Sequence, residues 1–189
     1  VTAANSTASP AASAKANTIS TPRITWSSTR CTPAIHADTP MVVVLPDTTE
    51  QVSRVLKYCQ AEGIKVVPRG SGTSLSGGAL PLVDGVLLGL GKFKRIREID
   101  FDNRVVVTEP GVTNLAISQA VAHAGFYYAP DPSSQIACSI GGNVAENSGG
   151  VHCLKYGMTT NNVLGCELVL MSGEVLRIGG KAAENAGYD

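Results

Sequence analysis

The chain has 189 residues, 43% hydrophobic and 16% charged, a composition typical of a folded chain that can bury a core. Its 15 basic and 15 acidic residues cancel, which argues against nucleic acid or an anionic membrane surface as a partner. The longest unbroken apolar run, residues 41–45, is far shorter than the roughly 20 residues that span a bilayer, so no transmembrane segment is expected.

The first 37 residues differ in composition from the rest. They contain no acidic residue, carry only Lys15, Arg23 and Arg30 as basic residues, and are rich in Ala, Ser and Thr. Such a segment has little to bury, which predicts a disordered, low-complexity tail. The same composition is also typical of an organelle transit peptide, which would place the protein in mitochondria rather than the cytoplasm. We expect residues 1–37 to be one of these and residues 38–189 to fold.

The folded part is expected to begin with a β-α-β unit. The apolar run 41–45 predicts a buried strand, and Asp47 with Glu50 resembles a capping box that starts a helix over 48–62. Gly63 suits the left-handed position that ends this helix, and a strand follows over 64–67. One apolar stripe runs along the helix: Val52, Val55, Leu56 and Cys59.

Further elements follow without strict alternation of strand and helix. Strands are predicted over 86–90, 96–99 and 105–108, a helix over 113–124, and a hairpin over 163–178 that turns at Ser172-Gly173. This mixture predicts an α+β fold, arranged in two small lobes.

The segment 68–79 follows a strand and is rich in glycine and hydroxyl side chains. Glycines let main-chain N–H groups turn towards a ligand and form a concavity that binds anions such as pyrophosphate. The dinucleotide fingerprint would need Gly where Leu75 stands, and a P-loop would need Lys where Gly78 stands, so neither pattern is present. A purely structural glycine loop is the alternative.

The segment 130–150 combines Pro, Gly and small polar side chains with few apolar anchors. A long loop of this kind inside a compact domain is usually functional or disordered, and rigid Pro beside permissive Gly favours a shaped loop. Asn143, Asn147 and Ser148 could hydrogen-bond a heteroaromatic ring. The alternative is a structural loop that packs under its neighbours.

Together these segments resemble the FAD-linked oxidase family of the vanillyl-alcohol oxidase (PCMH-type) fold, with the FAD-binding subunit of glycolate oxidase and D-lactate dehydrogenases as the nearest likeness. Three stretches carry the resemblance: RGSGTSLSGGALP at 69–81, PGVTNLAISQ at 110–119 and YYAPDPSSQIACSIGGNVAENSGGVHCLKYG at 127–157. The resemblance runs from Pro46 to Tyr188, but residues 26–36 match the family poorly.

The resemblance implies that FAD lies between the two lobes, with its pyrophosphate in the first loop. Covalent attachment of the flavin through His152 or Cys153 is not expected. The implied cofactor-binding residues are Pro68, Arg69, Gly70, Ser71, Gly72, Thr73, Ser74, Gly77, Pro130, Asp131, Ser134, Ser139, Gly141, Gly142 and Asn143, with Ser148, Gly149 and Gly150 nearer the flavin ring.

The reaction implied by the family is oxidation of a D-2-hydroxy acid, such as glycolate or D-lactate, to the 2-oxo acid. A quinone, a cytochrome or an iron–sulfur subunit would take the electrons. The cap domain that supplies the family's substrate-binding and catalytic groups has no counterpart in this sequence. We therefore assign no catalytic residue, expect partner subunits or a separate cap, and do not expect this chain to be active alone. The alternative is a non-catalytic structural subunit of a larger, plausibly mitochondrial, complex.

Cysteine and histidine spacing gives no sign of a metal site. None of the five cysteines forms a C-x-x-C pair, and the three histidines lie far apart along the chain. His123 falls on the helix predicted over 113–124 and is interpreted as a surface or packing residue.

Overall fold

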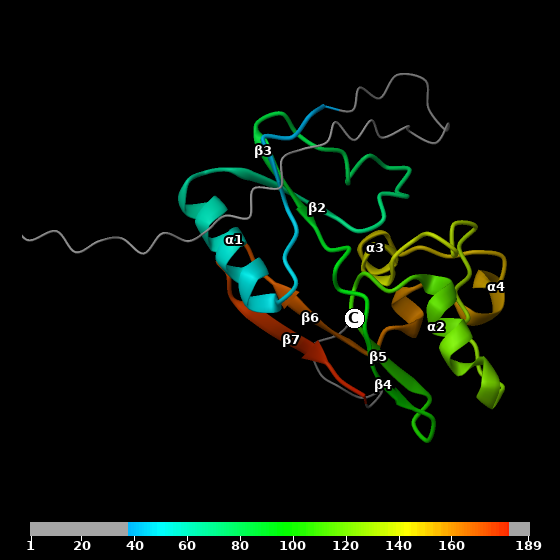
Figure 1. Ribbon diagram of the computed structural model, residues 1–189. Helices are drawn as coiled ribbons and strands as arrows, with labels where there is room; N and C mark the ends of the chain where they lie inside the picture. The colour runs from blue at the N-terminus through cyan, green and yellow to red at the C-terminus, as the bar shows by residue number, and fades with distance from the viewer. Residues whose placement is uncertain (1–37, 182–189) are drawn as a thin grey trace, which may run out of the picture. The chain divides into compact units, whose positions relative to one another are not determined.

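The computed structural model describes residues 38–181 (Figure 1). The prediction for residues 1–37 lies outside the described residues, as do residues 182–189. The elements in chain order are β1 (Val42–Val44), α1 (Thr49–Ala61), β2 (Lys65–Arg69), β3 (Gly85–Gly89), β4 (Ile96–Asp100), β5 (Val105–Thr108), α2 (Asn114–Val121), α3 (Ile140–Glu146), α4 (Cys153–Tyr156), β6 (Gly165–Val169) and β7 (Val175–Gly179), with short 3-10 turns at Ala122–Ala124 and Thr160–Asn162.

The first lobe is a parallel sheet in the order β1-β3-β2, with α1 beside it (Figure 1). The predicted apolar stripe of α1 is confirmed, because Val52 and Leu56 pack with Leu88 of β3 and with Phe93 in one core cluster. Gly63 has a φ of 65° directly after the helix, as predicted. Its left-handed conformation returns the chain to β2.

The start of α1 lies one residue from the prediction. Thr48, not Asp47, is the N-cap, and its hydroxyl accepts a hydrogen bond from the Gln51 N–H at 3.3 Å. The Gln51 side chain in turn accepts the Asp47 N–H at 2.9 Å. These two hydrogen bonds resemble a capping box. The difference is that the Gln51 side chain accepts from the residue before the N-cap and not from the N-cap itself.

The prediction of a buried first strand is wrong. Val42 and Val43 are 45% and 44% exposed, because β1 pairs with β3 on one side only and lies at an edge of the sheet. By contrast β3 pairs on both sides and is buried over four of its five residues, as predicted. A short apolar run looks the same in sequence whether the strand lies at the edge or in the centre of a sheet, so periodicity does not distinguish the two.

The second lobe contains the antiparallel hairpin β4–β5 with α2 and α3. Val112, Ile117 of α2 and Ile140 of α3 form its core cluster, against which Ile96 and Val106 of the hairpin pack. The two clusters match the two lobes expected from the sequence. The predicted hairpin near the C-terminal end is β6–β7, and α1 packs against β6.

Glu109 follows β5 and is a buried carboxylate, 3% exposed. It accepts hydrogen bonds from the Arg95 main chain at 2.9 Å and from both the Arg95 and Arg97 side chains. Burial raises the pKa of Glu109, but these hydrogen bonds outweigh burial and hold the pKa below its ordinary value of 4.5.

This carboxylate gives a pH-dependent prediction. The pKa of Glu109 is lower in the folded protein than in the unfolded chain. Its contribution to stability is therefore fully present at a pH above the pKa of the unfolded state, and it is lost as the pH falls through the pKa of the folded state. We expect Glu109→Gln to lower the free energy of unfolding by ~1–3 kcal/mol at pH 7. The difference in the free energy of unfolding between wild type and Glu109→Gln should become smaller as the pH falls below about 4.5, the region where a glutamate takes up its proton.

Urea unfolding of both proteins across this pH range measures the effect. Glu62→Gln is a suitable control because Glu62 is an exposed carboxyl after α1, and surface substitutions usually change stability by less than about 0.5 kcal/mol. A constant difference between wild type and Glu109→Gln at every pH would contradict the assignment.

Candidate functional site

The first glycine-rich loop leaves the end of β2 and is closed by Arg69. The Arg69 guanidinium donates a hydrogen bond to the Ala79 carbonyl at 3.1 Å, which joins the two ends of the loop. Gly72 has a φ of 71°, and a Cβ there would lie 2.3 Å from Arg69 Nη2. Gly72 is therefore favoured by its left-handed backbone conformation, whereas the nearby guanidinium is the end of a flexible side chain that can move aside.

The main-chain N–H groups of this loop suit an anionic group. Within residues 38–181, no protein group accepts a hydrogen bond from the N–H of Gly72, Thr73 or Ser74. The Thr73 side chain is exposed and the Ser74 side chain is half-buried, so hydroxyl donors lie beside these amides. N–H donors without a protein acceptor, beside hydroxyl groups, suit an anionic group, and the contact of this loop with a pyrophosphate stays a prediction.

The two predicted segments meet at Ser139. The Ser71 N–H donates to the Ser139 hydroxyl at 3.3 Å, and a Cβ at Gly70 would lie 2.2 Å from the same oxygen. Ser139 itself is buried, at 3% exposed. The fold thus places both glycine-rich segments at one site, although 68 residues separate the two serines.

The second segment is not a continuous loop, contrary to the sequence prediction. Residues Ile140–Glu146 form helix α3, which ends at Asn147 with a φ of 50°. The helix is held in place from outside, because Gly141 donates its N–H to the Pro110 carbonyl at 2.9 Å. A Cβ at Gly141 would lie 2.6 Å from Pro110 Cβ, so this glycine serves close packing of the helix.

Asn143 was predicted to face the cofactor, but its amide is buried and engaged. Its Nδ2 donates to Asn114 Oδ1 at 3.0 Å, and Asn114 Nδ2 donates to the Pro130 carbonyl at 2.9 Å. Asn114 is fully buried and Asn143 is 2% exposed. This network fixes α3 and the segment after Pro130 to the start of α2. Sequence reasoning missed Asn114, because an Asn at a helix start looks like an ordinary capping residue.

The turn after α3 lies against Asp131. A Cβ at Gly150 would lie 2.0 Å from the Asp131 carbonyl oxygen, and the Gly150 N–H donates to Cys153 Sγ at 3.0 Å. Ser148 is held from the other side, because the Thr159 hydroxyl donates to its carbonyl at 2.6 Å. The residues expected nearest the flavin are therefore rigidly placed by contacts within the domain.

The predicted cofactor residues divide by exposure. Those accessible at the surface are Pro68, Gly70, Ser71, Thr73 and Gly142. Half-buried positions are Arg69, Gly72, Ser74, Gly77, Asp131, Ser134, Gly141, Ser148, Gly149 and Gly150, whereas Pro130, Ser139 and Asn143 are buried. The three buried residues have little surface for a ligand to contact. The direct contacts of the others with a cofactor stay a prediction.

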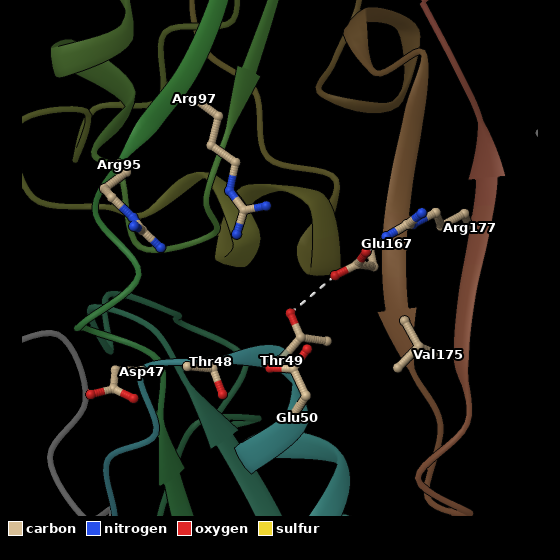
Figure 2. Close-up of a pocket in the computed structure, with 9 residues that line it drawn as sticks. All are labelled: Asp47, Thr48, Thr49, Glu50, Arg95, Arg97, Glu167, Val175 and Arg177. Carbon is tan, nitrogen blue, oxygen red and sulfur yellow. Dashed lines mark hydrogen bonds and ion pairs between the residues drawn. The ribbon is translucent and has the colours of Figure 1, made fainter.

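A separate cavity of about 450 Å³ opens at the N-terminal end of α1 (Figure 2). None of its lining residues belongs to either glycine-rich segment. Three acidic and three arginine side chains line the cavity, so their formal charges cancel. The Thr49 hydroxyl donates a hydrogen bond to the Glu167 carboxylate at 3.0 Å. Its lining residues are Asp47, Thr48, Thr49, Glu50, Arg95, Arg97, Glu167, Val175 and Arg177. This cavity is thus separate from the two glycine-rich segments.

Residues 38–181 contain no cluster of His, Cys, Asp and Glu that could hold a metal ion. No helix in the same residues has both the length and the apolar character needed to cross a membrane.

Comparison with known proteins gives consistent matches. The FAD binding domain family matches residues 40–179. Glycolate oxidase subunit GlcD of Escherichia coli K12 is 57% identical over 150 residues, which are 79% of this chain and 30% of that protein. D-lactate dehydrogenase of Archaeoglobus fulgidus is 42% identical over 148 residues, 78% of this chain and 33% of that protein. The chain thus spans about a third of the length of these relatives.

Solved structures show the same fold. Physcomitrella patens BBE-like 1 superposes with a TM-score of 0.65 and 26% identity, over 76% of this chain and 30% of that chain. The 6-hydroxy-D-nicotine oxidase of Arthrobacter nicotinovorans gives a TM-score of 0.64 at 22% identity, over 72% of this chain and 29% of that chain. These likenesses confirm the α+β, PCMH-type fold predicted from the sequence.

Proposed function

The chain belongs to the FAD binding domain family, and on that premise we propose that it is the FAD-binding portion of a flavoprotein dehydrogenase for D-2-hydroxy acids. Its cofactor is FAD, as the sequence predicted and the family match confirms. The names of two relatives, a glycolate oxidase subunit and a D-lactate dehydrogenase, support glycolate or D-lactate as substrate.

The observation that carries the proposal is the contact between the Ser71 N–H and the Ser139 hydroxyl. It brings the donor-rich first loop to the segment that leads into α3, so that one ligand can touch both. When bound, FAD supplies the redox chemistry by accepting a hydride from the substrate α-carbon. This chain's own residues bind and orient it: the loop amides and hydroxyls suit the pyrophosphate, and the turn at Gly149-Gly150 suits the ring.

The substrate-binding groups and the electron acceptor belong, in this proposal, to a cap domain or to partner subunits. One relative is itself named as a subunit of glycolate oxidase, which supports a multi-subunit assembly. A mitochondrial location is also part of the proposal. It is supported by the composition of residues 1–37 and by the name of a 36% identical rice relative, probable D-2-hydroxyglutarate dehydrogenase, mitochondrial.

A visible absorption spectrum tests the function first. The protein would be purified as its native assembly, and its spectrum recorded before and after denaturation, with the released cofactor identified by mass. We expect a flavin spectrum, released FAD, and turnover of glycolate or D-lactate, but not L-lactate, with an artificial acceptor dye. A colourless protein that takes up no added FAD would overturn the proposal and favour the alternative of a structural subunit.

A further inference from the structure

Asp131 and His152 form a two-point contact across the second segment. The His152 main-chain N–H donates to Asp131 Oδ1 at 3.2 Å, and His152 Nδ1 lies 2.8 Å from Asp131 Oδ2. The Asp131 side chain is 17% exposed and that of His152 is 51% exposed. Both carboxylate oxygens of Asp131 are thus engaged by one residue, which is a tighter arrangement than an ordinary surface ion pair.

This contact closes the turn that carries Gly149 and Gly150. Gly150 lies so close to the Asp131 main chain that a Cβ would meet its carbonyl oxygen at 2.0 Å. On the other side of the turn, a Cβ at Gly149 would lie 2.2 Å from Cys153 Sγ. The turn is therefore packed between Asp131 and Cys153, and His152 is the side chain that ties it to Asp131.

The imidazole has a defined orientation. Nδ1 lies 2.8 Å from Asp131 Oδ2, so this nitrogen faces the carboxylate and Nε2 lies on the other edge of the ring. On its other side the ring meets Tyr156 edge-to-face, with centroids 6.3 Å apart. Tyr127 meets the Tyr156 ring edge-to-face and Lys155 Nζ lies 4.9 Å from the centre of that ring, and interactions with Tyr127 and Lys155 lower the pKa of Tyr156. The ring is held between a carboxylate and a polar aromatic cluster.

We propose that His152 and Asp131 are a positioning pair that fixes the Gly149-Gly150 turn in the geometry that receives the flavin ring. This inference rests on the proposed function. His152 acts through Asp131 and the turn, so it is a positioning residue and not a catalytic one. Loss of the pair leaves the domain folded but lets the turn lift from Asp131, which weakens FAD binding and alters the surroundings of the flavin.

Three variants in the intact protein test the pair. His152→Leu removes the donor, whereas His152→Asn keeps an N–H donor near the position of Nδ1. His123→Leu is the matched control, because His123 is exposed and lies outside the site. The apo-protein would be titrated with FAD by fluorescence, the visible circular dichroism of bound flavin recorded, and the urea midpoint of each apo-protein measured.

We expect His152→Leu to raise the Kd for FAD roughly ten-fold, equivalent to ~1.4 kcal/mol, and to change the visible circular dichroism. His152→Asn should restore most of the affinity, and His123→Leu should bind FAD as wild type does. The apo midpoints should agree, because the pair acts on the turn and not on the global fold.

Two results would overturn only the inference: wild-type affinity in His152→Leu, or an equal loss of apo and FAD-bound stability, which indicates a purely structural contact. If wild type itself takes up no FAD, the proposed function fails and the inference fails with it.

Discussion

Gly150→Ala should weaken FAD binding by more than about 100-fold. The new methyl group would lie 2.0 Å from the Asp131 carbonyl oxygen and 2.4 Å from its carbonyl carbon, closer than any real contact. These obstacles are main-chain atoms, so no side-chain rotation relieves them. The φ of Gly150 lies outside the left-handed region, so the effect is steric rather than conformational. The turn must lift from Asp131 and carry Gly149 with it.

Overpacking of this kind typically costs ~1–3 kcal/mol, and here the whole of the displacement falls on the predicted flavin-facing turn. We expect the Kd for FAD to rise more than about 100-fold, equivalent to ~2.7 kcal/mol. Fluorescence titration of the apo-protein measures it. Gly91→Ala is the control, since a Cβ there meets no heavy atom within 4 Å and Gly91 lies outside both glycine-rich segments, and it should bind nearly as wild type. Normal binding by Gly150→Ala would show that the turn does not approach Asp131 as described.

Local signals in the sequence were sufficient for most elements. The apolar stripe of α1 and the turn glycines Gly63 and Gly173 were predicted correctly, because each depends on residues within one or two turns of the chain. Positive φ values of 65° and 81° at these glycines confirm the turns. The cofactor was inferred from family resemblance and not from such patterns.

What could not be predicted depends on contacts between distant segments. Helix α3 has two glycines in its first turn, directly after Ile140, and glycine is a poor helix former. The sequence therefore predicted a loop there. It is helical because Pro110 approaches Gly141 and because Asn143 bonds to Asn114. The hydrogen bond between Ser71 and Ser139 likewise cannot be predicted from either segment alone. Tertiary contacts therefore decide the site, whereas local pattern decides the scaffold around it.

The buried amide network behind the site leads to the second large expected effect. Asn114→Leu keeps nearly the same volume but removes the donor to the Pro130 carbonyl and the acceptor for Asn143 Nδ2. Each orphaned buried group costs about 1–3 kcal/mol, so we expect the free energy of unfolding to fall by roughly 2–5 kcal/mol. Urea unfolding of the cofactor-free protein measures it. Gln119→Leu makes the same kind of change at an exposed position of α2 and should be nearly neutral.

A double-mutant cycle separates this network from ordinary packing. If the loss in Asn114→Leu comes from the unpaired Asn143 amide, removing that amide as well in Asn114→Leu/Asn143→Leu should cost less than the two single substitutions added together. The Pro130 carbonyl stays unpaired in both Asn114 variants, so recovery should be partial. Strictly additive losses would mean that the two side chains act independently. The contact that joins α3 to α2 would then be a consequence of the fold rather than one of its supports.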